Sequence, residues 1–391
     1  MGTQVDLADV VQEWEAWLGP EDLAKARYHL RMQIGRFVTG LVTPLLLVAL
    51  WLPTGWAVAL RDALQANASW WRTWLYVILM GLSAFGLAFP FMWWFEFRAE
   101  QRLGTLRQSF RAWLWDVVKE KAVAGLVQSA FVAGLYWVFR RWPDAWLIGL
   151  VVGVGVFLMV AYALQPVLLR LRYRAEPLDD PELHAQLAEL FARAGVPFSG
   201  VAVLRVSEKT ARGNAALVPH GAGTRVVVFD TLLQALSPRA LVAVVAHELG
   251  HKVHRDMLKL MIVLAVGLVA VLSMAYGLLR VIGWWDGLQG PGDVATLPLL
   301  WLMLSWLGAG LQVLLNAYMR RVEEAADAYA LALTRDPAGL EEAFRVLARQ
   351  NKTLPQPPLW VERLLYNHPS LARRVLALRR AAARGDGSAS S

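Results

Sequence analysis

The sequence predicts a mainly α-helical, polytopic membrane protein with a smaller α+β module outside the membrane. Hydrophobic residues make up 57% of the 391 residues and charged residues only 18%, whereas soluble domains are nearer half apolar and a quarter charged. Six apolar runs are long enough to cross about 30 Å of hydrocarbon. They cover residues 37–60, 73–95, 122–139, 145–169, 258–282 and 297–319.

Basic side chains are concentrated in the segments that fall on one side of these six runs. They occur in the N-terminal arm, in loop 96–121, directly after the fourth run, and at Arg320-Arg321 after the sixth. The positive-inside rule places this side, with both termini, in the cytoplasm. The membrane would be the inner membrane of a prokaryote or the endoplasmic reticulum of a eukaryote. Because the surplus charge lies in these loops and no nucleic-acid motif is present, a nucleic-acid partner is not expected.

The remaining segments predict the second module. A helix is expected over 181–194, and strand-like runs at 201–206 and 225–229, with a turn around 219–223, indicate a short β-sheet. The predicted organisation is an N-terminal cytoplasmic arm (1–36), four membrane helices (37–169), the first part of the module (170–257), a membrane hairpin (258–319), the rest of the module (320–383) and a disordered tail (384–391).

The motif His247-Glu248-Leu249-Gly250-His251 is the strongest chemical signal in the chain. It lies in a run that reads as helical, and residues four apart share one face of a helix. His247 and His251 can therefore direct two imidazoles at one point, with Glu248 beside them to hold a water. Two histidines, a third ligand and an open position are typical of catalytic zinc. The alternative is an amphipathic helix with two surface histidines. The sequence has no Cys, so the third ligand must be His, Asp or Glu.

A third ligand is expected beyond the membrane hairpin. A helical hairpin returns the chain to the face that it left, so residues just before the fifth run and just after the sixth should be close. His251 precedes the fifth run by about two turns, and Glu323 follows the sixth by about one. Glu323 would complete a His₂Glu site. Asp327, four residues later on the same helix face, could hydrogen-bond a ligating histidine.

Position alone leaves an alternative for this acidic cluster. Glu323 and Glu324 could simply pair with Arg320 and Arg321 on a solvated helix. Glu324 lies about 100° further round the helix and is the weaker ligand candidate of the two. His254 is close to the face of the first two histidines, but we expect it to be a bystander because His₂Glu already fills the protein's share of ligands.

Several separate motifs resemble the Ste24-type M48 membrane zinc metalloproteases, the group that includes CAAX prenyl protease 1. The resemblance covers about residues 20–380. The His-Glu-x-x-His motif is followed by an R-x-E-x-x-A-D-x-x-A segment and then by an H-P-S-x-x-x-R motif. Shorter matching segments precede all three. The matching segments are Glu100–Gly104, Gly213-Asn214-Ala215, Val227–Leu233, His247–His251, Arg321–Ala330 and His368-Pro369-Ser370 with Arg374.

The resemblance implies a zincin-like α+β metalloprotease module with one Zn²⁺ per chain. Its register selects Glu323 over Glu324 as the third ligand. The resemblance also implies that His368 stabilises the oxyanion of the reaction and that Arg374 supports His368 near the metal. It further implies that Asn214 and Ala215 line the strand along which the substrate lies. Without the family, His368 reads as an ordinary loop residue before a proline.

The expected function is a zinc-dependent membrane endopeptidase acting on hydrophobic, prenylated or membrane-associated proteins. An HtpX-like protease that degrades misfolded membrane proteins is the alternative, and a non-proteolytic membrane scaffold is a weaker one, since a binding-only zinc site needs no Glu248. The chain departs from the family in having six apolar runs rather than seven. A polar, acidic helix around 6–18 takes the place of the leading span.

Overall fold

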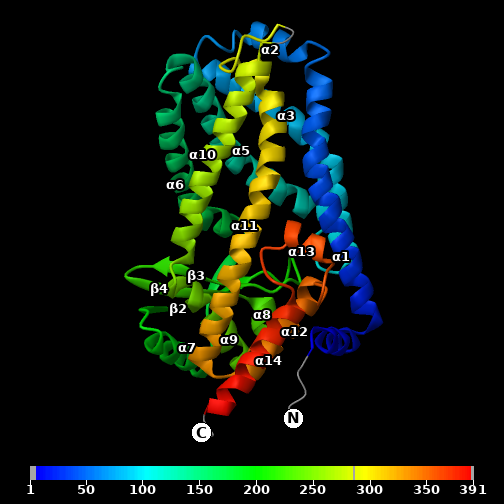
Figure 1. Cartoon of the computed structure of the whole chain (residues 1–391), viewed down its shortest axis with the longest axis vertical. Coiled ribbons are helices and arrows are strands. Elements are labelled where there is room, and N and C mark those ends of the chain that lie inside the picture. Colours follow the sequence, from blue (N-terminus) through cyan, green and yellow to red (C-terminus); the bar gives the residue numbers. More distant parts are fainter. Residues whose placement is uncertain (1–5, 285–286, 389–391) are drawn as a thin grey trace.

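The computed structural model of the chain describes residues 6–284 and 287–388. Long helices form one half of the molecule, and shorter helices packed around a small sheet form the other (Figure 1). The helices of the first half are α1 (Leu7–Trp51), α2 (Trp56–Leu64), α3 (Trp70–Met92), the π-helical η1 (Trp93–Arg98), α4 (Ala99–Arg102), α5 (Phe110–Arg141), α6 (Trp146–Arg172), α10 (Asp256–Ile282), the 3₁₀ turn η2 (Val294–Thr296) and α11 (Leu297–Thr334).

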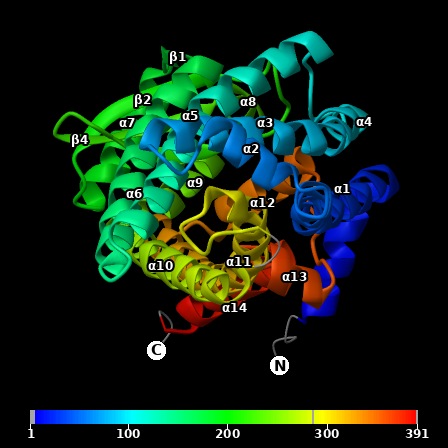
Figure 2. The ribbon, with the colours of Figure 1, turned by 90° about the horizontal axis from the view of Figure 1, so that it is seen from above.

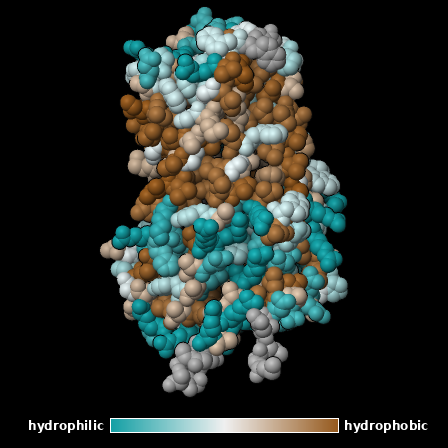
Figure 3. All heavy atoms as spheres, viewed as in Figure 1, coloured by the Kyte–Doolittle hydropathy of each residue, from teal (hydrophilic) through white to brown (hydrophobic). Residues whose placement is uncertain are grey.

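Membrane character is confirmed by the long helices. Within the described ranges, six helices are long and apolar enough to cross a membrane, and they lie in α1, α3, α5, α6, α10 and α11. On the face shown in Figure 3, hydrophobic side chains form a broad band across the helical half, whereas hydrophilic side chains cover much of the other half. The chain is therefore an integral, multi-pass membrane protein.

The second half contains a four-stranded mixed sheet in the order β1-β2-β4-β3. Strands β2 and β4 are parallel and correspond to the two predicted runs, while β3 pairs antiparallel with β4 and lies at an edge. Strand β1, at the opposite edge, was not predicted; all four of its residues are exposed, so no alternation of buried residues marks it. The elements are β1 (Arg174–Pro177), α7 (Pro181–Arg193), β2 (Phe198–Arg205), β3 (Ala215–His220), β4 (Gly223–Phe229), α8 (Asp230–Ala235), α9 (Pro238–Val253), α12 (Pro337–Asn351), α13 (Leu359–Leu365) and α14 (Leu371–Ser388).

Helix α1 differs from the two segments predicted for this part of the chain. It runs through residue 36 without a break, so the arm and the first membrane span share one helix. It ends at Trp51, before the predicted limit at residue 60, because Pro53 and Gly55, the latter with φ 71°, form a turn that leads into α2. Within α1, Pro44 leaves the carbonyl of Gly40 without its helical donor, and Ser305 Oγ of α11 donates to it at 2.7 Å.

The N-terminal part of α1 packs on the module and not against the membrane helices. Gly19, at φ 75° and ψ 169°, kinks the helix. The preceding turns bury Val10 and Trp14 in the module core, and Glu13 accepts from Arg379 Nη1 at 2.7 Å. The acidic segment around 6–18 is thus a docked helix. At the other terminus, the tail predicted to be disordered is helical as far as Ser388, and residues 389–391 lie outside the described residues.

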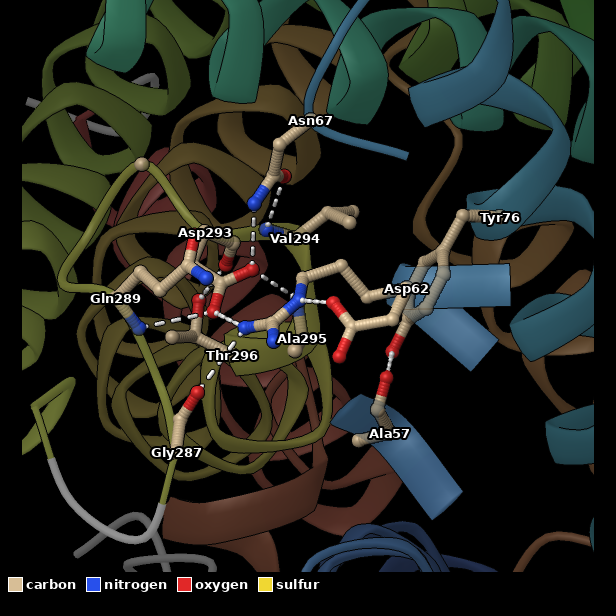
Figure 4. Close-up of polar contacts among 12 residues, drawn as sticks. Ala57, Asp62, Asn67, Tyr76, Gly287, Gln289, Asp293, Val294, Ala295 and Thr296 are labelled. Atoms are coloured by element: carbon tan, nitrogen blue, oxygen red, sulfur yellow. Dashed lines mark hydrogen bonds and ion pairs between the residues drawn. The ribbon is translucent and has the colours of Figure 1, made fainter. Parts of the chain in front are cut away.

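A buried polar network closes the end of the bundle that is remote from the module. Asp293 accepts from Arg61 Nη1 at 2.6 Å, from Asn67 Nδ2 at 2.9 Å and from the backbone N–H of Gln289 at 2.9 Å (Figure 4). Arg140 of α5 donates to Asn67 Oδ1 at 3.3 Å and to the Gly292 carbonyl at 2.9 Å. These bonds join α2 and α5 to residues 287–296, so the helices are held together at the end opposite the module.

Candidate metal centre and active site

Helix α9 carries the His-Glu-x-x-His motif, as predicted. Ser237 caps it by accepting from the Ala240 N–H at 3.3 Å, and Pro238 occupies its first turn, where a missing N–H costs nothing. Gly250 allows close packing against α11: a Cβ there would lie 3.1 Å from Ala326 Cα. The motif helix therefore lies directly against the helix that carries the expected third ligand.

Three side chains converge between these two helices. His247 Nε2 lies 3.2 Å from Glu323 Oε2, and His251 Nε2 lies 3.4 Å from Glu323 Oε1. The two Nε2 atoms are 3.2 Å apart, and the potential ligand atoms all lie within 4.8 Å of one another. Glu323 is only 3% exposed. Glu324, by contrast, is exposed, so the structure separates the two adjacent glutamates as the helix geometry predicted.

The outer ring nitrogens of both histidines face carboxylates. His247 Nδ1 lies 2.9 Å from Asp327 Oδ1, and His251 Nδ1 lies 3.1 Å from Asp256 Oδ2. Protons on the Nδ1 atoms would direct the Nε2 lone pairs at each other and at a buried carboxylate, an arrangement that is repulsive unless a cation lies between them. The donor set of two imidazoles and one carboxylate fits a divalent metal such as zinc.

The electrostatics of the metal-free site agree with a cation-binding role. Burial disfavours a charged His247 ring, but Asp327 and Glu323 outweigh it and raise the pKa of His247 to about 9. Burial likewise opposes charging of His251, yet Glu323 and Asp256 raise its pKa above the ordinary value. The site therefore attracts positive charge strongly enough to hold a proton where a metal would otherwise bind.

Glu248 and His368 lie beside the cluster. Glu248 lines the same cleft as His247 and Glu323, and burial raises the pKa of its carboxyl above the usual range. His368 Nε2 lies 3.2 Å from Glu323 Oε1, and the side chain is 49% exposed. Its other ring nitrogen is 2.7 Å from Asn367 Oδ1. The ring thus faces both the site and the cleft.

Arg374 reaches the metal site through Asp327. It makes a two-pronged ion pair, with Nε to Oδ2 at 2.7 Å and Nη2 to Oδ1 at 2.6 Å, and its Nη2 is 3.7 Å from Glu323. The pair is largely buried, and two parallel N–H···O bonds fix the plane of the carboxylate. Arg374 therefore orients Asp327, which in turn faces His247.

The cleft beside the metal cluster has a volume of about 340 Å³. Its lining includes Asn214 and Ala215, at the start of edge strand β3, together with His368 and Phe344. Asn214 Oδ1 accepts from the Ala215 N–H at 3.0 Å. Since β3 has a partner on only one side, an extended peptide could pair with its free edge.

Figure 2 shows the arrangement of the long helices seen from above. A second, larger cavity lies among their side chains. Its volume is about 720 Å³, and its walls come from α1, α3, α5, α6, α10 and α11. Most lining side chains are apolar, and Arg36, Thr43, Glu96, Gln128 and Ser305 are among its polar ones. All six spans therefore contribute to the walls of one cavity in the membrane half.

Two residues near the site were not predicted from the sequence. Asp256 faces His251 because Arg255, at φ 56°, adopts a left-handed conformation that turns the chain back after α9. Arg320 donates to backbone carbonyls of residues 362–366 and not to the neighbouring glutamates. His254 packs edge-on against Tyr329, with ring centroids 5.5 Å apart, and is not part of the three-residue cluster.

The pattern of peptidase family M48 matches residues 177–382, more than half of the chain. The chain belongs to peptidase family M48. A second pattern, described as the N-terminal part of CAAX prenyl proteases with five membrane helices, matches residues 20–170. This region contains four of the long apolar helices, α1, α3, α5 and α6. The metal that an M48 metalloprotease requires has a matching site in His247, His251 and Glu323.

Relatives of this M48 protein share most of its length. An uncharacterized metalloprotease YhfN of Bacillus subtilis is 26% identical over 96% of this chain and 88% of its own. CAAX prenyl protease 1 of Saccharomyces cerevisiae is 23% identical over 74% of this chain and 68% of its own. The crystal structure of S. mikatae Ste24p has the same fold, with a TM-score of 0.78 at 22% identity, over 96% of this chain and 92% of that one.

Proposed function

We propose that this M48 protein is a zinc-dependent endopeptidase that cleaves hydrophobic or membrane-associated protein substrates. One observation carries the proposal: His247 and Glu323 of the metal cluster, Glu248, His368 and the start of edge strand β3 all line one cleft. A binding-only metal site would need neither a buried carboxylate beside the ligands nor an edge that accepts a peptide.

In the proposed mechanism His247, His251 and Glu323 would hold the zinc. The bound zinc would supply Lewis-acid activation of a water molecule. Glu248 lines the cleft beside the metal ligands, where it would accept the proton from this water and later deliver it to the leaving amine. His368 donates a hydrogen bond to the substrate carbonyl oxygen as negative charge develops, and loss of such a donor typically costs about 3–4 kcal/mol.

The substrate would lie extended along β3, with main-chain hydrogen bonds to the strand edge beside Asn214 and Ala215. The apolar cavity in the membrane half would accept a hydrophobic part of the same substrate, which favours membrane-associated or lipidated proteins. Prenylated peptides are one candidate class of substrate, suggested by the name of the yeast relative. Misfolded membrane proteins, the substrates of a quality-control protease, are the second candidate class.

The decisive experiment compares the purified protein with Glu248→Gln in detergent. Bound zinc is measured in both, and cleavage is assayed with casein and with a farnesylated CAAX peptide. We expect full zinc loading in both, and activity only in the unaltered protein. Glu324→Gln is the matched control, because Glu324 is exposed on the neighbouring face of α11, and it should remain active.

Equal cleavage, or none, by the unaltered protein and Glu248→Gln with zinc bound in each would refute the protease proposal. Cleavage of casein but not of the farnesylated peptide would favour the quality-control function. Cleavage of the farnesylated peptide but not of casein would favour the prenyl-protein function.

We also propose that the catalytic module is cytoplasmic, as the basic segments near it predict. The sequence has no Cys, so single cysteines can report the orientation. Thr54, in the exposed turn at the remote end, and Glu208, exposed on the module, are suitable positions. In intact cells, a membrane-impermeant maleimide should label Thr54→Cys and spare Glu208→Cys until the membrane is opened. The opposite pattern would place the module outside.

A further inference from the structure

Helix α11 presents a row of polar side chains between its membrane-crossing part and the metal site. Gln312, Asn316 and Arg320 are spaced four residues apart and so share one face of the helix. Gln312 Nε2 donates to Asn316 Oδ1 at 2.8 Å. Asn316 is only 1% exposed, and an amide buried to this extent requires partners for its donors as well as its acceptor.

The partners are the backbone carbonyls at the end of α13, which lies beside α11 (Figure 1). Asn316 Nδ2 donates to the Leu364 carbonyl at 2.7 Å. Arg320 Nη1 donates to the Tyr366 carbonyl at 2.8 Å and to the Glu362 carbonyl at 3.2 Å. The Glu362 carbonyl also accepts from the Tyr366 N–H at 3.2 Å, whereas the carbonyls that follow it lie at the helix end, where donors within the helix run out. α11 therefore supplies external donors to the C-terminal end of α13.

The loop after α13 carries His368. Glu362 Oε1 accepts from the Ser370 N–H at 3.2 Å, so the loop is fastened on its other side as well. The His368 side chain itself is half exposed, and beyond the metal site its nearest polar partner is the adjacent Asn367. Its position over Glu323 thus depends on where the backbone of the 366–370 loop is held.

We propose that Arg320 and Asn316 are positioning residues for His368. Glu323 follows Arg320 by three residues on the same rigid helix. α11 therefore carries both the third metal ligand and the donors that hold the His368 loop, and this sets the distance from the carbonyl-polarising donor to the metal. The inference rests on the proposed role of His368 in the reaction.

The experiment is a double-mutant cycle in the full-length, zinc-loaded protein. Arg320→Met keeps the stem of the side chain and removes its donors, whereas Arg320→Lys keeps a charge and one donating group. Arg363→Met is the matched control, because Arg363 is exposed on α13 itself. kcat, KM and zinc affinity are measured with a peptide substrate, for each variant alone and combined with His368→Ala.

We expect Arg320→Met to lower kcat about tenfold or more. This loss should be smaller than the roughly hundredfold or greater loss that follows when an oxyanion donor is removed outright, because His368 is displaced and not absent. KM and zinc affinity should change less than about twofold, Arg320→Lys should recover most of kcat, and the control should match the unaltered protein. In the His368→Ala background, Arg320→Met should have no further effect, because residues that act through one another are not additive. Asn316→Leu provides a second route to the same pattern if Arg320→Met does not fold.

Equal losses of kcat from Arg320→Met with and without His368 would overturn the inference, as would a parallel loss of zinc affinity. If His368→Ala leaves kcat unchanged, the role proposed for His368 fails and the inference fails with it. Glu248→Gln still tests the protease function separately.

Discussion

Replacing Asp256 should weaken zinc binding without weakening the fold. Asp256 Oδ2 lies 3.1 Å from His251 Nδ1, on the side of the ring that faces away from the metal cluster. A carboxylate in this place fixes the ring orientation and makes the imidazole a better ligand, and loss of such a partner typically costs 10- to 100-fold in metal affinity. This range corresponds to about 1.4–2.7 kcal/mol.

Two variants separate the contribution of the Asp256 charge to zinc affinity from that of its hydrogen-bond acceptor. In Asp256→Asn the amide oxygen can still accept from Nδ1–H, so only the charge is lost and we expect about a tenfold decrease in zinc affinity. In Asp256→Ala the acceptor is lost too, and the decrease should approach a hundredfold. The other ion-pair partner of Asp256 is Lys259, whose Nζ lies 3.4 Å from Asp256 Oδ1. The Lys259 side chain is 54% exposed, and ion pairs of exposed side chains contribute at most about 1 kcal/mol to stability.

The assay is competition for zinc against a chromophoric chelator, in detergent at fixed pH, with the melting temperature of the metal-free protein measured in parallel. Lys259→Gln is the control: it removes the exposed partner, keeps the carboxylate beside His251, and should leave zinc affinity unchanged. Zinc affinity of Asp256→Ala within a factor of two of the unaltered protein would refute the reasoning, because it would show that other contacts orient His251.

Three further predictions concern the same framework. The pKa of His247 is about 9 without metal, so below that pH zinc must displace a proton; its association constant should rise about tenfold per pH unit and level off near pH 9. A pH-independent affinity between pH 7 and 9 would contradict this. Gly250→Ala places a methyl 3.1 Å from Ala326 Cα, which should separate α9 from α11, lower stability by about 1–3 kcal/mol and weaken zinc binding in the same competition assay. Asp293→Ala removes one of the two carboxylates that pair with the buried Arg61. Stability in detergent should fall by about 3 kcal/mol, seen as a lower melting temperature, while zinc affinity at the opposite end stays unchanged.

Local periodicity accounts for what could be predicted about the site. The spacing of His247 and His251 places both on one face of any α-helix, whatever surrounds it. The hairpin argument extended this to Glu323, because two membrane-spanning helices in succession must return the chain to the same face. The structure brings together all three, with Asp327 and Arg374 behind them.

The same kind of reasoning could not reach contacts that depend on loop conformation. Asp256 faces His251 only because Arg255 takes a left-handed backbone conformation, and nothing in its side chain marks a non-glycine residue for that region. The edge position of β3 likewise follows from sheet order, which pairs β4 with β2 and leaves β3 with one partner. Strand composition does not specify which neighbour a strand will have.

The sequence by itself predicted the membrane class, six apolar spans, the paired histidines of the metal-binding motif and one helix face shared by Glu323 and Asp327. Each of these follows from hydrophobic length or from helix periodicity, which are local properties of the chain. Only the tertiary structure decided that the N-terminal acidic helix docks on the module, that the six spans border one cavity, and that Arg320 holds the backbone next to His368. These are contacts between segments far apart in the chain, and they depend on how whole helices pack.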